Sequence, residues 1–192
     1  MEYIVEKIGM TRTTTVPAFA VTLVRIVEAK VCEVDENKRA IVAYPYGKKT
    51  NKAIEGQQKK YGLTAEFNRF KTMDVANAEV GDIDVAPLTE AKIVKSTFVS
   101  KGRGFAGVMK RHNFSGGPGA HGSRFHRRVG SIGNAEWPGR VQRGKKMPGH
   151  YGVDQKTAKN EIVSYDAETG IVALKGGVAG SNGSFGTIRI VK

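Results

Sequence analysis

The chain has 192 residues and a net charge of +13, from 31 Lys and Arg residues against 18 Asp and Glu residues, and this length allows one ordinary domain, alone or with an appendage. The single cysteine, Cys32, excludes an internal disulfide; we expect no secretory signal, and the longest apolar run is far too short to span a membrane. The expectation is a soluble cytoplasmic protein with a polyanionic partner, nucleic acid first and an anionic membrane surface second.

The first half of the chain has the short apolar runs with alternation that are typical of β-strands. Strands are predicted over residues 2–9, over 19–34 (two successive strands or one long bent one) and, after a turn at 35–38, over 40–46. The next stretch is polar, rich in helix formers and closed by Gly62. It predicts a short surface helix at about 51–61.

The second half continues the β pattern on both sides of a long polar segment. Strands are predicted over residues 66–73, 82–88 and 92–99, over 161–165 and 171–174 as a hairpin joined through 166–170, and over 187–191 after a loop that turns at Asn182-Gly183. Seven or eight short strands with one small helix favour a closed barrel or sandwich over a doubly wound sheet. The predicted fold is mainly β, a closed β-barrel with a long basic irregular extension inserted between strands.

The extension covers residues 101–152. It holds 11 of the 31 basic residues but one carboxylate, Glu136, so it carries +10 of the net charge, together with all four histidines, the only tryptophan and 13 of the 24 glycines. So few large apolar side chains do not offset the entropy of ordering so many glycines, and we expect the extension to need an anionic partner for order. The predicted domains are a barrel of residues 1–100 with 153–192 and the extension of 101–152.

Three motifs in the extension suggest other chemistry, and their context argues against each. Residues 102–107 match G-x-G-x-x-G, but glycines and proline follow where a dinucleotide fold needs a helix, and no acidic residue stands about 20 positions later. The histidines have no cysteine pair or close carboxylates to complete a zinc site. Ser115 and Ser123 lie near histidines but have no nearby acid except Glu136 to orient a catalytic base. We therefore expect no cofactor, no metal and no enzymatic activity.

The extension has the composition of an RNA-binding segment. Its cations are separated by glycines, which allow close approach to phosphates, and its aromatic rings can stack on splayed bases. Pro118, Pro138 and Pro148 exclude an amphipathic membrane helix of useful length. The alternative of a flexible solvated linker fits the Trp and His content poorly. The candidate RNA-binding residues are Lys101, Arg103, Lys110, Arg111, His112, Asn113, His121, Arg124, His126, Arg127, Arg128, Trp137, Arg140, Arg143, Lys145, Lys146 and His150.

Several short motifs resemble a known family in their order along the chain. They are Ile8-Gly9-Met10-Thr11, SKGRGFAG at 100–107, KRHNF at 110–114, GSIG at 130–133, Pro138-Gly139-Arg140, GKKM at 144–147, and the closing KGGV at 175–178 with GSNG at 180–183. Over nearly the whole length, the chain resembles the bacterial form of large-subunit ribosomal protein L3.

This resemblance implies a barrel on the outside of the large ribosomal subunit and an extension that threads through 23S rRNA towards the peptidyl transferase centre, with residues 137–152 nearest to it. It also implies an early role in subunit assembly, neighbouring ribosomal proteins at the barrel, and no small-molecule substrate. A glutamine that is methylated in some members corresponds to His150, so that modification is not carried over.

Two other functions stay open at this point. A free-standing nucleic-acid chaperone or regulator would have the same charge, but would stay apart from large subunits in sedimentation. A cofactor-dependent enzyme using the 102–107 loop would be stabilised by a nucleotide against heat. The resemblance favours the ribosomal protein over both.

Overall fold

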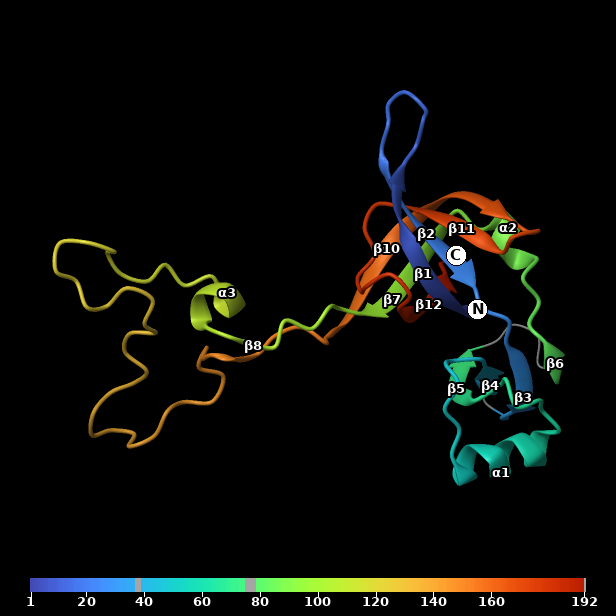
Figure 1. Cartoon of the computed structure of the whole chain (residues 1–192), viewed down its shortest axis with the longest axis horizontal. Coiled ribbons are helices and arrows are strands. Elements are labelled where there is room, and N and C mark those ends of the chain that lie inside the picture. The colour runs from blue at the N-terminus through green and yellow to red at the C-terminus, as the bar shows by residue number, and fades with distance from the viewer. Residues whose placement is uncertain (37–38, 75–78, 192) are drawn as a thin grey trace. The chain divides into compact units, whose positions relative to one another are not determined.

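The computed structural model describes residues 1–36, 39–74 and 79–191. They form two compact units, one of Met1–Ser100 with Gln155–Lys192 and one of Lys101–Asp154. The first unit contains two sheets and the second contains the basic extension (Figure 1).

The first sheet is a closed antiparallel barrel, which confirms the predicted mainly-β fold. Its strands are β1 (Glu2–Arg12), β2 (Ala20–Ile26), β7 (Ile93–Val99), β10 (Gln155–Asp166), β11 (Ile171–Lys175) and β12 (Phe185–Ile190). They follow the order β1-β12-β7-β10-β11-β2 around the barrel, and β1 pairs with β2 to close it. Closure gives every strand of the barrel a paired neighbour on both sides, so none of the six is an edge strand.

Alternate residues of these strands fill the barrel interior, as the period of two predicts. The strands contribute the buried residues Tyr3, Val5, Val24, Val94, Phe98, Val172, Leu174 and Ile188 to this core, and segments outside the strands add Leu88 and Val178. Phe98 pairs in register with Gly186, and a Cβ on this glycine would lie 2.5 Å from the ring. The ring therefore occupies the space that any other residue at this position would need.

The second sheet accounts for the strands of the first half that do not enter the barrel. It has the order β5-β4-β3-β6, with β3 at Lys30–Val34, β4 at Arg39–Tyr44, β5 at Arg69–Asp74 and β6 at Gly81–Asp82. A second core of Ile4, Ala29, Val31, Ala40, Val42 and Met73 joins it to β1. The 19–34 run is thus two strands that enter different sheets.

Strand β1 serves both cores, which disturbs its alternation. Tyr3 and Val5 belong to the barrel interior, while Ile4 between them is buried against the second sheet, so three consecutive residues are buried. The strand also continues past the predicted end at Gly9, with a register shift between Lys7 and Gly9, and forms a long hairpin with β2 (Figure 1).

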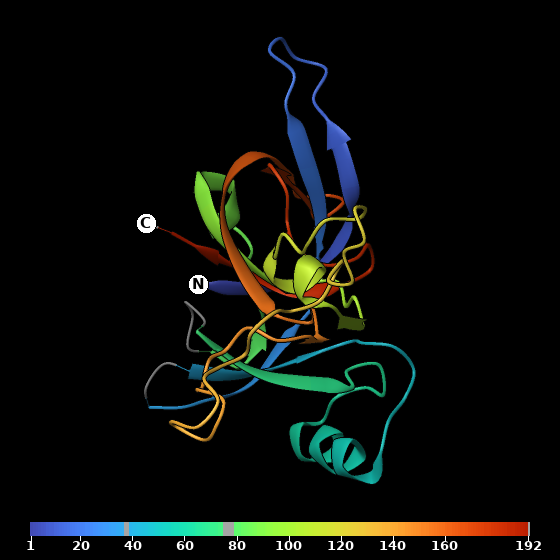
Figure 2. The same ribbon diagram turned by 90° about the vertical axis from the view of Figure 1, so that its left-hand side faces the viewer.

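The predicted surface helix is confirmed as α1 (Lys52–Tyr61), which lies beside the second sheet (Figure 2). Its N-cap residue, Asn51, accepts a hydrogen bond from the Ile54 amide at 2.9 Å. Gly62 ends the helix in the left-handed region with φ of 61°. Both ends follow from local chemistry.

Other expectations were wrong in detail. The 82–88 run is not a strand: β6 stops at Asp82, and Pro87–Glu90 form the short helix α2, where the absent N–H of Pro87 costs no helical bond. The described residues contain twelve strands rather than seven or eight. The 35–38 turn begins with an Asp35 N–H to Arg39 carbonyl bond of 2.8 Å, but residues 37–38 lie outside the described part.

A buried lysine organises the loop before β12. Lys7 is 6% exposed, and its ammonium donates to the carbonyls of Val178 at 2.6 Å and Gly180 at 3.2 Å. Gly180 has φ of 90°, and a Cβ there would lie 2.5 Å from Ser184 Oγ. The glycine-rich loop at 175–183 therefore supplies the carbonyl groups that bind the buried Lys7 ammonium.

One pH dependence of stability follows from Tyr3. Burial raises the pKa of Tyr3 to about 12, with smaller contributions from Asp84 and Tyr165, and its hydroxyl donates to the Asp84 carbonyl at 3.1 Å. In the unfolded chain, a tyrosine has a pKa of about 10. The unfolded chain therefore loses this proton before the folded one does, and the free energy of unfolding falls between about pH 10 and 12. Tyr3→Phe is expected to show a shallower fall in urea unfolding over this range, and to be about 1 kcal/mol less stable at pH 7.

The control for Tyr3 is Tyr46→Phe, which removes a hydroxyl from a side chain that is 46% exposed. This variant should keep the pH dependence of the unmodified chain. An identical slope above pH 10 in the two variants would contradict the role assigned to Tyr3.

Candidate nucleic-acid interface

The two limbs of the extension are paired at its base. Strand β8 (Phe105–Ala106) pairs antiparallel with β9 (Gly149–His150). Next to them the Arg103 amide donates to the Tyr151 carbonyl at 2.8 Å, and the Tyr151 amide donates to the Gly104 carbonyl at 2.9 Å. The extension thus leaves and returns as a short hydrogen-bonded ribbon.

Gly152 lets the limbs come this close. Its φ is +83°, and a Cβ there would lie 2.1 Å from the Lys101 carbonyl oxygen and 3.0 Å from the Gly102 Cα. Both obstacles are backbone atoms, which do not move aside as a flexible side chain can. The base therefore requires glycine at this position.

A short helix, α3 (Val108–His112), follows β8 and is tied to the opposite limb. The Arg111 guanidinium donates to the Met147 carbonyl at 2.8 Å, and His112 Nε2 lies 3.1 Å from the same oxygen. A Cβ on Gly149 would lie 2.6 Å from Arg111 Nη1. We call this arrangement of Arg111, His112, Met147 and Gly149 the clamp.

Helix α3 corrects one expectation from the sequence. No helix was expected after the 102–107 glycine loop, yet α3 begins at Val108 and ends after five residues at Asn113, whose φ is 59°. A helix this short is not the long helix that follows the phosphate loop of a dinucleotide fold.

Residues 113–148, all of them described, contain no helix or strand but have local order (Figure 1). The Gly117 amide donates to the His126 carbonyl at 2.7 Å, closing a loop. The Phe125 ring lies against Gly117 and Gly130, where added Cβ atoms would be 2.6 Å and 3.3 Å from it. Glycines therefore provide space for the packing of an aromatic ring within this loop.

The candidate RNA-binding residues differ in exposure. Fifteen of the seventeen are exposed, and Trp137 is 84% exposed. The two half-buried residues are Arg111 and His112, which form the clamp. At the base, the Arg103 guanidinium carbon lies 5.4 Å from the centre of the Tyr151 ring, and the His150 and Phe105 rings meet edge to face at 6.0 Å.

The structure thus separates two roles within the predicted set. Arg111 and His112 hold the two limbs together, while the exposed cations face solvent with Glu136 as the one carboxylate of 101–152. Among the described residues, no three His, Cys, Asp or Glu side chains are grouped to hold a metal ion. Within the same described part, no helix is long and apolar enough to cross a membrane.

The sequence of this chain matches known proteins over most of its length. Residues 48–176 match the family model described as Ribosomal protein L3. The chain is 67% identical to Large ribosomal subunit protein uL3 of Campylobacter jejuni and 58% identical to that of Helicobacter pylori, in each case over 192 residues and the full length of both chains. The chain belongs to the ribosomal protein L3 family. This family is a structural component of the ribosome and not an enzyme.

The similarity extends to more distant L3 proteins. Large ribosomal subunit protein uL3 of Thermosipho melanesiensis is 40% identical over 97% of this chain and 96% of its own length. Two of the motifs that suggested the L3 family lie at constrained points of the structure: KRHNF at 110–114 contains the end of α3 and its cap, and GKKM at 144–147 ends at the clamp.

Sequence reasoning did not find two contributors to this L3 extension. Met147 acts through its carbonyl, and a backbone acceptor leaves no mark in side-chain chemistry. Gly152 stood among 13 glycines of the extension, where composition does not distinguish a required glycine from a tolerated one.

Proposed function

We propose that this chain binds 23S rRNA through its extension and stabilises the folded rRNA during assembly of the large ribosomal subunit. In this role the chain lies in the cytoplasmic ribosome beside other large-subunit proteins, and its extension is directed towards the peptidyl transferase centre. The relatives are named as large ribosomal subunit proteins, which supports the location.

One observation carries the proposal: the extension, whose two limbs are paired at the base, presents a dense set of exposed cations with almost no carboxylate near them in sequence. Such a surface repels itself in the free protein and gains free energy when phosphates replace the missing counter-charge. Positive-φ glycines allow its backbone to approach the RNA closely, and an exposed ring such as Trp137 can stack on a base. The mechanism is electrostatic and architectural.

Salt dependence tests the mechanism. Six to eight phosphate contacts imply a log–log slope of binding against salt of about −4 to −7. The triple variant Arg124→Gln, Arg127→Gln, Arg128→Gln is expected to make that slope shallower by about 3 and to weaken binding to large-subunit rRNA about a hundredfold at 0.15 M salt. Filter binding of the transcribed rRNA over a salt series measures both quantities.

The matched control is Lys48→Gln, Lys49→Gln, Lys52→Gln, which removes the same charge from exposed positions around the start of α1. It should bind rRNA nearly as well as the unmodified chain. An unchanged slope in the arginine variant would overturn the proposal. Sedimentation of the unmodified chain apart from large subunits at moderate salt would indicate a free-standing chaperone instead.

A further inference from the structure

The barrel carries a row of three cations that the extension does not explain. Lys95 of β7 pairs in register with Lys159 of β10 on one side and with Arg189 of β12 on the other. Their strand neighbours Val94, Ser96, Asn160 and Ile188 are buried, so these three side chains point to the outer face, and all three are exposed. Neighbouring strands lie about 4.8 Å apart, so the row is closely spaced.

This row is unfavourable for the free protein. Like charges directly opposite each other on neighbouring strands destabilise a sheet. Arg189 has partial compensation from Glu2 at 3.8 Å and from Asp74 at 3.5 Å. Lys95 and Lys159 form no ion pair with any described residue. The carboxylate of Glu161, two residues further along β10, is held by Lys175 at 2.7 Å. The two ammonium groups are therefore available to bind an anionic partner.

A row of hydroxyls lies beside the cations. Two residues along the same strands, Thr97 pairs with Thr157 and with Thr187, and the Oγ1 atoms of Thr97 and Thr157 are 2.9 Å apart. A period of two places these threonines on the same face as the lysines. Hydroxyls and cations together are the side-chain groups that bind phosphate and ribose.

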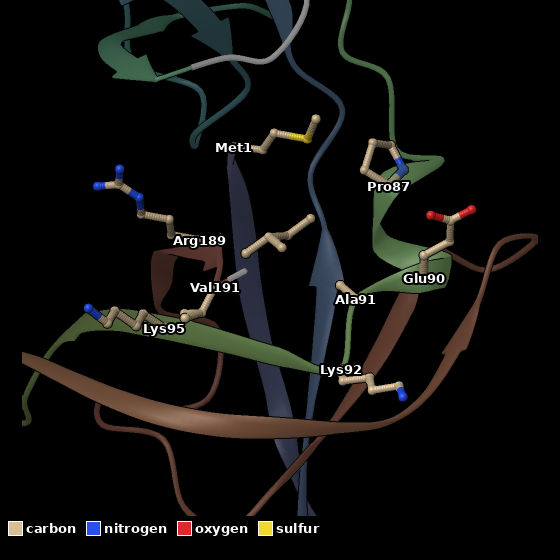
Figure 3. Close-up of a pocket in the computed structure, with 9 residues that line it drawn as sticks. Met1, Pro87, Glu90, Ala91, Lys92, Lys95, Arg189 and Val191 are labelled. Carbon is tan, nitrogen blue, oxygen red and sulfur yellow. The ribbon is translucent and has the colours of Figure 1, made fainter.

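A pocket of about 860 Å³ lies against the end of the row. Its lining includes Lys95, Arg189 and Lys92, with Glu90 as its carboxylate. Figure 3 shows Lys95 and Arg189 extending from neighbouring strands on the same side of this pocket. The cationic surface therefore borders a concave region rather than a flat one.

We propose that the outer face of β10, β7 and β12, here called the cation row (Lys159, Lys95 and Arg189, with Thr157, Thr97 and Thr187), is a second RNA-binding surface that grips a sugar-phosphate backbone. The inference rests on the proposed function, because it adds a contact to the same RNA partner. Three cations and three hydroxyls on adjacent positions offer little apolar area to a protein partner, and none of these six residues has a ring to stack on a base. The surface is therefore expected to bind without reading sequence.

The test is the full-length double variant Lys95→Gln, Lys159→Gln, with Lys48→Gln, Lys49→Gln as the matched control. Against transcribed large-subunit rRNA, the double variant is expected to make the salt slope shallower by about 2 and to weaken binding about thirtyfold at 0.15 M salt. Its melting temperature without RNA should rise by about 1–3 °C, because the repulsion within the row is removed. The control should leave the slope and the melting temperature unchanged.

The inference would be overturned if the salt slope of the double variant were unchanged. It would also be overturned if the slope became shallower by the same amount in the control. Comparison with the Arg124, Arg127, Arg128 triple variant separates the two proposals. If rRNA binding is weakened only in the arginine variant, the proposed function stands and the cation row is not an RNA site. If rRNA binding is weakened in neither variant, both proposals are overturned. Normal rRNA binding with loss of a neighbouring ribosomal protein from reconstituted subunits would assign the row to a protein partner and overturn it as an RNA site.

Discussion

A chain lacking residues 104–149 is expected to fold and melt cooperatively, yet to fail in subunit assembly. All residues of the two hydrophobic cores lie in 1–100 and 155–192. Val99 and Gln155 are paired in register, so the deletion leaves a nine-residue connection between two strands that already lie side by side. Closing a loop of this length costs little.

The assembly defect should be severe because the deletion removes nine of the eleven cations in 101–152 and leaves only Lys101 and Arg103 at the base. At about 0.7 log units per contact at 0.15 M salt, loss of even six contacts weakens rRNA binding by about four orders of magnitude. Calorimetry of the deleted protein and its incorporation into reconstituted large subunits measure the two outcomes. Loss of cooperative melting would show that the extension is part of the folded core.

The second large effect is expected from Gly152→Ala at the base of the extension. The new Cβ would meet the Lys101 carbonyl and the Gly102 Cα, and the residue would have to keep a left-handed φ. Strain of this kind costs about 1–3 kcal/mol before the clash is counted, so the base is expected to open rather than accept it. The Arg103–Tyr151 hydrogen bond would then be lost.

Hydrogen exchange at the Arg103 amide should increase at least tenfold in Gly152→Ala, and incorporation into subunits should fall, while the barrel melts normally. The matched control is Gly133→Ala in the same extension, where nothing lies within 4 Å of the added Cβ and φ is not in the left-handed region. This variant should behave like the unmodified chain. Equal exchange rates in both variants would show that the base does not depend on Gly152.

Local features of the fold could be predicted because local chemistry determines them. The helix α1 has a capping Asn51 before it and Gly62 after it, and the 161–174 hairpin has two alternating runs around a glycine loop. The concentration of charge in 101–152 could also be read from the sequence because it is a property of composition, and most of the cations that it indicated are exposed.

Some errors have a shared cause, which is that tertiary contacts override local preference. The 82–88 run has the apolar residues of a strand, but Ile83 and Val85 pack against the cores from an irregular segment and Pro87 begins α2. A structural contact also escaped local patterns: the Arg111 guanidinium donates to the Met147 carbonyl, which lies 36 residues later in the chain.

By itself, the sequence determined the mainly-β class, the position of α1 and the placement of a basic, glycine-rich extension between strands. Charge, turn residues and alternation act over a few residues, so they can be read directly. Only the tertiary structure decided that β2 and β3 enter different sheets, that Lys7 is buried, that the clamp ties the two limbs, and that Lys95 lies between Lys159 and Arg189. Each of these joins residues far apart in the chain, and such pairings depend on register and closure of the barrel, which no local pattern encodes.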